Sequence, residues 1–187
     1  ARVLSRSDIE KNTTIPFLGV IRQGKFTDDF TTLMKSISLK YSENHPCISI
    51  NSTLSEEGKS YIADGLAGAY AKSGKSVCLI DFSTTTTSGR KYNGNFRTWD
   101  SKKTVNPGVT ILSTDENDTP SQESIGDLKQ QFDIVLLDTP ATANEINGIE
   151  AMQTADLVLF VVRANHTCIN YLSEPELIRE EFGLGQM

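Results

Sequence analysis

The sequence predicts an α/β fold in which helices flank a mostly parallel sheet on both faces. Short apolar runs recur along the chain, and each is continuous rather than alternating, which is typical of strands buried on both faces. Helical patterns lie between these runs, and that alternation indicates βαβ units with right-handed crossovers. The runs expected to form strands are Cys47–Ile50, Val77–Ile80, Val109–Leu112, Ile134–Leu137 and Leu157–Val162.

Four segments carry the spacing of an amphipathic helix. In the second of them Ile62, Leu66 and Tyr70 share one face, and Gly74 follows as a C-terminal cap. Ahead of the first helix, residues 15–21 (IPFLGVI) form a short apolar extended segment. Residues 82–108 show no clear periodicity, which is typical of a functional or disordered loop. The expected helices are Thr27–Leu39, Ser60–Lys72, Ser121–Gln131 and Glu145–Thr154.

Length and composition favour one soluble domain, with residues 1–40 as an N-terminal extension and helix and residues 41–187 as the core. The net charge of -6 argues against a nucleic-acid partner, which needs a basic face. No apolar run approaches the roughly 18 residues that span a bilayer. No signal-peptide pattern requires export, although the chain can be part of a larger membrane protein. Three cysteines without a CxxC spacing favour reduced thiols in the cytoplasm.

The stretch ISINSTLSEEGKSY (48–61) has the strand–loop–helix context of a phosphate-binding loop. The usual pattern is G-x-x-x-x-G-K-[ST], and Thr53 stands in place of its first glycine. The helix N-terminus behind the loop attracts anions. With ATP or ADP as the expected ligand, Lys59 is expected to reach the β-phosphate and, in ATP, the γ-phosphate, and the Ser60 hydroxyl to bind Mg²⁺. The expected nucleotide-contact residues are Ser55, Glu57, Gly58, Lys59, Ser60 and Tyr61.

Two further strands end in a carboxylate. Asp81 ends the run SVCLIDF, and Asp138 ends the run FDIVLLD. Open parallel sheets bind ligands at the carboxyl ends of their strands, so both side chains are expected beside the phosphate loop. An Asp in the position of Asp138 can hold Mg²⁺ through water, and Asp81 together with Lys59 is the expected catalytic pair.

The order GKS, VCLIDF, FDIVLLDTPA and ADLVLFVVRANHT resembles the bacterial tyrosine kinases (BY-kinases) of capsule and exopolysaccharide synthesis, within the MinD/ParA-type P-loop ATPases. The resemblance covers almost the whole chain. It implies that Asp81 is the first carboxylate of a second Walker-type motif and that Asp138 is the Walker B carboxylate. Leu54 occupies the place of the signature lysine of the MinD/ParA proteins, which favours the kinase branch.

The departures from the family pattern predict a degenerate nucleotide site. The family's Pro-Gly-x-Gly turn is Ser55-Glu56-Glu57-Gly58 here, and the left-handed backbone that glycine adopts is costly for Glu56. Ser83 replaces the second carboxylate after Asp81. The helix arginines of ring assembly are replaced by Thr31 and Met34. The five tyrosines are dispersed, although a tail that carries a tyrosine cluster can have been removed.

The resemblance therefore implies a BY-kinase-like cytoplasmic domain of an exopolysaccharide or capsule biosynthesis and export protein, with weak or absent kinase activity. It would act at the inner face of the bacterial inner membrane, with a membrane-embedded polysaccharide co-polymerase region as partner, in cis or in trans, and in a homo-oligomer. Two alternatives remain open at this point. One is an active ATP-dependent tyrosine autokinase, and the other is a MinD/ParA-like positioning ATPase.

Overall fold

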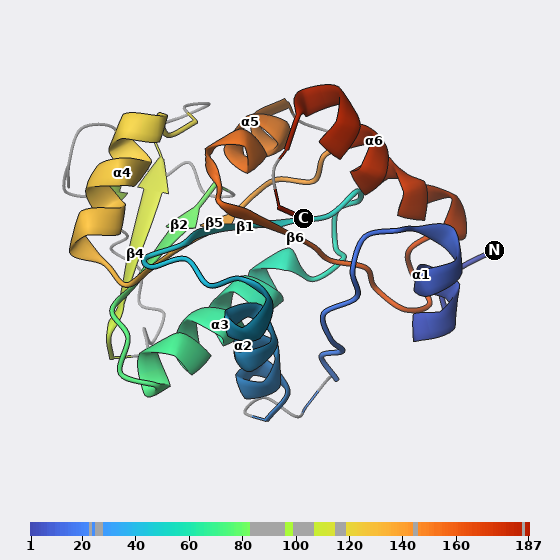
Figure 1. Ribbon diagram of the computed structural model, residues 1–187, viewed down its shortest axis with the longest axis horizontal. Helices are drawn as coiled ribbons and strands as arrows, with labels where there is room; N and C mark the ends of the chain where they lie inside the picture. The colour runs from blue at the N-terminus through green and yellow to red at the C-terminus, as the bar shows by residue number, and fades with distance from the viewer. Residues whose placement is uncertain are drawn as a thin grey trace.

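A six-stranded sheet forms the centre of the protein (Figure 1). The computed structural model describes residues 1–22, 24, 28–82, 96–98, 107–114, 119–143, 146–184 and 186–187, with the backbone alone for 96–98 and 146–147. From β4 to β6 all neighbouring strands are parallel, and β3 is antiparallel to β4 at one edge. The spatial order is β3 (Phe96–Thr98), β4 (Val109–Thr114), β2 (Val77–Asp81), β5 (Ile134–Asp138), β1 (Cys47–Asn51) and β6 (Leu157–Phe160).

Helices cover both faces of the sheet, as expected. In Figure 1, α2 (Asp28–Lys40) and α3 (Lys59–Lys72) lie below the sheet. On the other face lie α4 (Gln122–Gln131), α5 (Ile146–Thr154) and α6 (Glu174–Phe182). The continuous apolar runs explain this arrangement. Within β1, Ile48 and Ile50 pack towards α3, whereas Cys47 packs into the cluster that contains residues of α4 and α5.

Helices α2 and α3 approach each other closely at one glycine. A Cβ atom on Gly65 would lie 2.1 Å from the ring of Phe30, which is itself fully buried. The same ring lies 5.6 Å, centroid to centroid, from that of Tyr61 in the first turn of α3. The absence of a side chain at residue 65 therefore allows the α2 aromatic ring to lie against α3, just behind the phosphate loop.

The N-terminal segment packs against the β6 side of the molecule. Val3 forms two backbone hydrogen bonds with the turn after β6, donating to Thr167 O (2.9 Å) and accepting from Asn165 N (2.8 Å). The guanidinium of Arg6, in α1 (Arg6–Asn12), lies 4.8 Å from the centroid of the Phe17 ring. On α6, the Glu176 carboxylate accepts hydrogen bonds from Thr13 and Thr14. Residues 1–21 are thus tied to both β6 and α6.

The strands and helices expected from the sequence are confirmed, with a few corrections. The last expected strand, Leu157–Val162, ends at Phe160, because a tight turn over residues 163–167 follows almost at once. Phe96–Thr98 forms a strand inside the segment 82–108, which was expected to be irregular. The 3₁₀ helix η1 (Ile169–Ser173) and helices α1 and α6 were not expected at all. Among the described residues, the longest helices fall short of the length and apolarity needed to cross a membrane.

Candidate functional site at the carboxyl edge of the sheet

The carboxyl edge of the sheet brings together the three predicted groups of polar side chains. Asp81 and Asp138 end neighbouring parallel strands and are register partners between β2 and β5. Asp138 is also the register partner of Ile50 in β1, the strand that leads into the loop 52–58. The charges of Lys59 and Asp81 both act on Asp138. The expectation that Lys59, Asp81 and Asp138 emerge side by side therefore agrees with the geometry.

Asp138 is buried, with 4% of its surface exposed. Burial raises the pKa of its carboxyl to about 6, and the charge of Asp81 contributes to the rise. The Ser60 hydroxyl, which hydrogen-bonds the carboxyl, and the Lys59 ammonium both favour the ionised form. Burial and the like charge of Asp81 outweigh these two groups, so the net shift of the pKa is upward. A divalent cation bound nearby would favour the ionised carboxylate.

Lys59 is the first residue of α3, and its ammonium is turned back into the loop. Its Nζ donates a hydrogen bond to Ser52 Oγ over 2.9 Å. Burial lowers the pKa of Lys59, while the charges of Asp138 and Glu57 oppose that change. Ser52 in turn donates to Leu54 O. The lysine expected to hold phosphate is therefore already partnered within the loop.

The loop keeps the left-handed geometry of a phosphate loop at two positions. Gly58 has φ 99° and Glu56 has φ 63°. A positive φ is routine for glycine and costs a residue with a Cβ atom about 1–2 kcal/mol. The sequence predicted that this backbone angle would be strained for a residue such as Glu56, and Glu56 adopts it. Something outside the loop must hold it there, because strained backbone persists only where the surroundings over-determine it.

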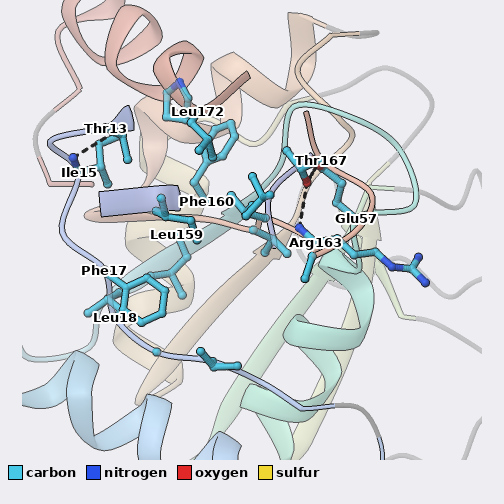
Figure 2. A pocket seen from close by; sticks show the side chains of 18 of the residues that line it. Thr13, Ile15, Phe17, Leu18, Glu57, Leu159, Phe160, Arg163, Thr167 and Leu172 are labelled. Carbon is cyan, nitrogen blue, oxygen red and sulfur yellow. Dashed lines mark hydrogen bonds between the residues drawn. The ribbon is translucent and has the colours of Figure 1, made fainter. Parts of the chain in front are cut away.

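The contacts that hold the loop come from the turn after β6. The Arg163 guanidinium donates a hydrogen bond from Nη1 to Glu56 O over 2.8 Å. The Thr167 hydroxyl donates to the Glu57 carboxylate, and the other carboxylate oxygen of Glu57 accepts from Leu54 N at 2.9 Å. Figure 2 shows Glu57, Arg163 and Thr167 side by side. These turn residues were not among the expected site residues.

Two of the remaining expected contact residues, Ser55 and Tyr61, lie in different surroundings. Ser55 is exposed, and Tyr61 packs against Phe30. A pocket of about 640 Å³ opens beside the loop between residues 3–21, β6 and the start of α3 (Figure 2). Its lining includes Glu57, Gly58 and Tyr61 but neither Lys59 nor Asp138. Neither residue of the carboxylate pair lines this pocket, so the pocket is separate from the pair. Ser83, expected as a departure from the family pattern, lies outside the described residues.

The residues at the edge fit Mg²⁺ and a nucleoside polyphosphate. Ser60 and Asp138 offer the hydroxyl and carboxylate oxygens that a hard cation prefers. Lys59 and the first turn of the 14-residue helix α3 supply positive charge and N–H groups for phosphate oxygens. The group with raised pKa, Asp138, is the one that faces this positive charge, so a bound cation would restore its ionised form.

Together, this sheet order and the strand–loop–helix segment at its carboxyl edge are those of the MinD/ParA-type P-loop ATPase superfamily. The family model described as ATPase MipZ matches residues 48–171, and the chain belongs to that family. A search of curated proteins gives no match.

Solved structures share the fold. The chimerical protein CapA2B2 is similar with a TM-score of 0.76 at 18% identity, over 97% of this chain and 96% of that one. The BceF tyrosine kinase domain gives a TM-score of 0.76 at 16% identity, over 100% of this chain and 96% of that one. The septum site-determining protein MinD of Pyrococcus horikoshii, solved with Mg-ADP, gives 0.57 at 18% identity, over 75% and 67%. At these identities the likeness concerns the fold.

Proposed function

We propose that this chain is a BY-kinase-like cytoplasmic domain of an exopolysaccharide or capsule biosynthesis and export protein. Its nucleotide site would be degenerate, with weak or absent tyrosine kinase activity, so that the domain acts mainly in regulation or assembly. In this proposal ATP or ADP binds weakly at Gly58, Lys59 and Ser60, and Mg²⁺ at Ser60 and Asp138. Asp81 would serve as the residual general base.

The state of the phosphate loop carries the proposal. Lys59 and Glu57, two charged residues of the loop, both have partners inside the protein. A polyphosphate has to displace the hydrogen bond from Lys59 to Ser52 and approach a buried carboxylate. Both steps weaken binding, because a lost charge contact and a like charge each cost free energy that the ligand must supply.

The solved neighbours support the biological setting by their names. BceF is described as a tyrosine kinase domain, and the kinase domain of the Escherichia coli tyrosine kinase ETK shares the fold with a TM-score of 0.69. By analogy, we propose a membrane-embedded co-polymerase region as partner, in cis or in trans, and self-association of the domain. The proposed location is the inner face of the inner membrane, with residues 41–187 as the ATPase core.

The test is thermal unfolding of the full chain with ADP or ATP, with and without Mg²⁺. Ligand equal to its Kd stabilises by about 0.4 kcal/mol, whereas a thousandfold excess gives about 4 kcal/mol. We expect a small stabilisation at millimolar ADP, and we expect Lys59→Ala to change it little. Lys59→Arg, which keeps the charge, is the matched control.

A large ADP-dependent stabilisation that Lys59→Ala abolishes would contradict degeneracy and favour the active autokinase. That alternative is examined by mass spectrometry of the protein after incubation with ATP and Mg²⁺. Phosphotyrosine that forms in the unmodified chain and disappears in Asp81→Asn would establish it.

The match to the MipZ ATPase family and the shared fold of MinD favour a second candidate, a MinD/ParA-like positioning ATPase. Leu54 stands where such proteins carry their signature lysine, which counts against it. ATP-dependent, salt-sensitive binding to DNA or to anionic vesicles would favour this second candidate over the kinase-like domain.

A further inference from the structure

We propose that the turn Arg163–Thr167 replaces the missing glycines of the phosphate loop. In this proposal Arg163 and Thr167 are positioning residues. They act through Glu56 and Glu57, and they hold the loop in the conformation that a Gly-rich loop adopts unaided. The inference deepens the proposed function, since it rests on the same nucleotide site and explains how that site keeps its shape.

The first step is the strain at Glu56. Its φ of 63° is one that glycine reaches freely, and the loop around it has glycine only at residue 58. A left-handed penalty of this kind corresponds to roughly 5- to 30-fold in the population of the conformation. The Arg163 guanidinium hydrogen-bonds the carbonyl oxygen of Glu56 itself, so it acts directly on the strained residue.

The second step is the pair of hydrogen bonds that the Glu57 carboxylate accepts. Its side chain is buried with 3% exposure, and its two oxygens bridge the loop and the turn. One accepts from Leu54 N within the loop, and the other accepts from the Thr167 hydroxyl. A buried carboxylate without partners is costly, so Glu57 favours the arrangement in which both hydrogen bonds form.

The third step is the rigidity of the turn. Thr167 Oγ1 accepts a hydrogen bond from Arg163 N over 2.9 Å, which leaves its single hydrogen for Glu57. Thr167 N and His166 N both donate to Arg163 O. Val3 adds its backbone hydrogen bonds to Asn165 and Thr167 from the N-terminal segment. The turn is therefore fixed by contacts independent of the loop, as a positioning element requires.

The test is amide hydrogen exchange of the loop, residues 54–58, in the full chain without nucleotide. We expect Arg163→Met and Thr167→Val to accelerate exchange there about tenfold. The conservative variants Arg163→Lys and Thr167→Ser, which keep a donor, should stay within about twofold of the unmodified chain. Residues Leu66–Tyr70 of α3 serve as the internal reference and should not change.

The decisive variant is Glu56→Gly. Because glycine adopts the left-handed angle freely, Arg163→Met in the Glu56→Gly background should change loop exchange by less than about twofold. Loop exchange that is unchanged in Arg163→Met and Thr167→Val would overturn the inference. An Arg163→Met effect that persists at full size in the Glu56→Gly background would also overturn it. The turn would then stabilise the loop in a way that does not depend on the backbone strain at residue 56.

These measurements need no ligand, so they separate the inference from the proposed function. If the unmodified chain shows no stabilisation by millimolar ADP, the nucleotide-binding part of the proposed function fails while the exchange data still decide the role of the turn. If ADP binds, Arg163→Met should lower its affinity about tenfold, and Glu56→Gly should restore it.

Discussion

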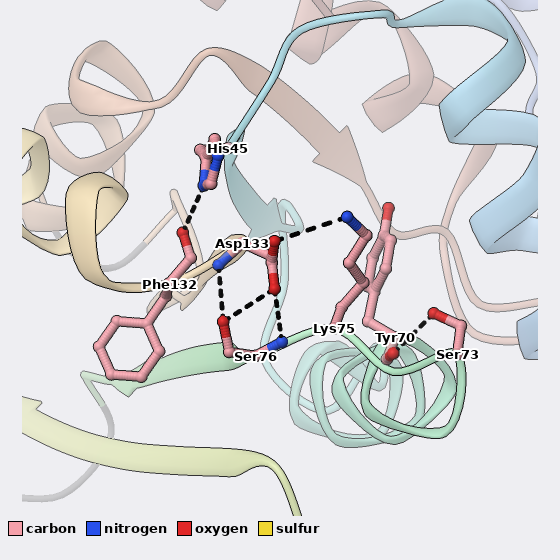
Figure 3. A network of polar contacts seen from close by, with 7 residues as sticks. All are labelled: His45, Tyr70, Ser73, Lys75, Ser76, Phe132 and Asp133. Carbon is pink, nitrogen blue, oxygen red and sulfur yellow. Dashed lines mark hydrogen bonds and ion pairs between the residues drawn. The ribbon is translucent and has the colours of Figure 1, made fainter.

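The two edges of the sheet carry polar networks of opposite character. At the carboxyl edge Asp81 and Asp138 are neighbouring like charges, and Asp138 is buried. At the amino edge Asp133 is half-buried and lies within a network of polar contacts (Figure 3). It accepts from the Ser76 amide (2.8 Å) and hydroxyl (2.9 Å) and forms an ion pair with Lys75 at 3.5 Å.

The pKa values of the two aspartates are consequently shifted in opposite directions. Burial raises the pKa of Asp138, whereas hydrogen bonds from the Ser76 amide and hydroxyl lower the pKa of Asp133, with a contribution from Lys75. One edge therefore holds a charge that the folded chain tolerates at a cost. The other holds a charge that helps the chain fold. Ionisable groups whose pKa is shifted by burial and a neighbouring charge are typical of functional sites.

The largest expected effect is that of Asp138→Asn on the free energy of unfolding. One pKa unit corresponds to about 1.4 kcal/mol, so a rise from 3.8 to about 6 costs the folded protein roughly 2–3 kcal/mol above pH 6. Since that pKa already includes the opposing effects of Ser60 and Lys59, we expect Asp138→Asn to gain roughly 2–3 kcal/mol at pH 7.5. Urea unfolding without ligand measures it.

The pH dependence provides the control for Asp138. A carboxyl whose folded pKa is raised contributes stability that is complete below its unfolded pKa and is lost as the pH rises through about 6. The gain from Asp138→Asn should therefore shrink as the pH falls from 6 and disappear by about pH 3, below the unfolded pKa of 3.8. A variant that is less stable than the unmodified chain at pH 7.5 would show that Asp138 stabilises the fold.

A smaller effect of opposite sign is expected for Asp133→Asn. A carboxyl whose folded pKa is lowered contributes stability that is present above its unfolded pKa and is lost as the pH falls through the folded value. The variant should therefore be less stable at pH 7.5, with the difference vanishing in acid. The same urea series detects this loss. Nucleotide binding should not change, and a change there would mean that the two edges are coupled.

The smallest effect is expected for His45→Gly, the amino-edge counterpart of Glu56→Gly. His45 has φ 53°, and its ring Nδ1 lies 2.9 Å from Phe132 O (Figure 3). Relief of the backbone angle and loss of a hydrogen bond at the surface are both about 1 kcal/mol and of opposite sign. Urea unfolding should therefore differ by less than about 0.5 kcal/mol. A larger loss would show that the ring bond outweighs the strain.

Most of the fold could be predicted because its signal is local. Continuous runs such as Ile134–Leu137 predict strands buried on both faces, and the interleaved helices then favour a parallel order. Helix α1 gave no such signal, because it has no buried residue. Helix α6 buries Pro175 and Ile178, which is too little to produce a readable apolar stripe. Strand β3 pairs antiparallel at the edge and lies within a polar segment.

The site could be predicted in part, for the same reason. Lys59, Asp81 and Asp138 each follow or end a strand, and topology alone brings strand ends together. The role of the turn could not be predicted, because Thr167 meets Glu57 across 110 positions of sequence. One signal was available, because the polar run Arg163–Thr167 follows β6 at the same carboxyl edge. Open parallel sheets bind ligands at the carboxyl ends of their strands, so polar residues there are candidates for the site, as Asp81 is.

The pairing of the first residues with the turn has a mechanical consequence. Ile169 N donates a hydrogen bond to Ala1 O, and Val3 forms backbone hydrogen bonds with Asn165 and Thr167. Arg163 and Thr167 in turn donate hydrogen bonds to the phosphate loop. Tension applied at Ala1 would load these hydrogen bonds and the buried side chain of Val3 before it reached the strands of the sheet. A fusion partner or tether joined to that end would therefore pull first on the turn that positions the phosphate loop.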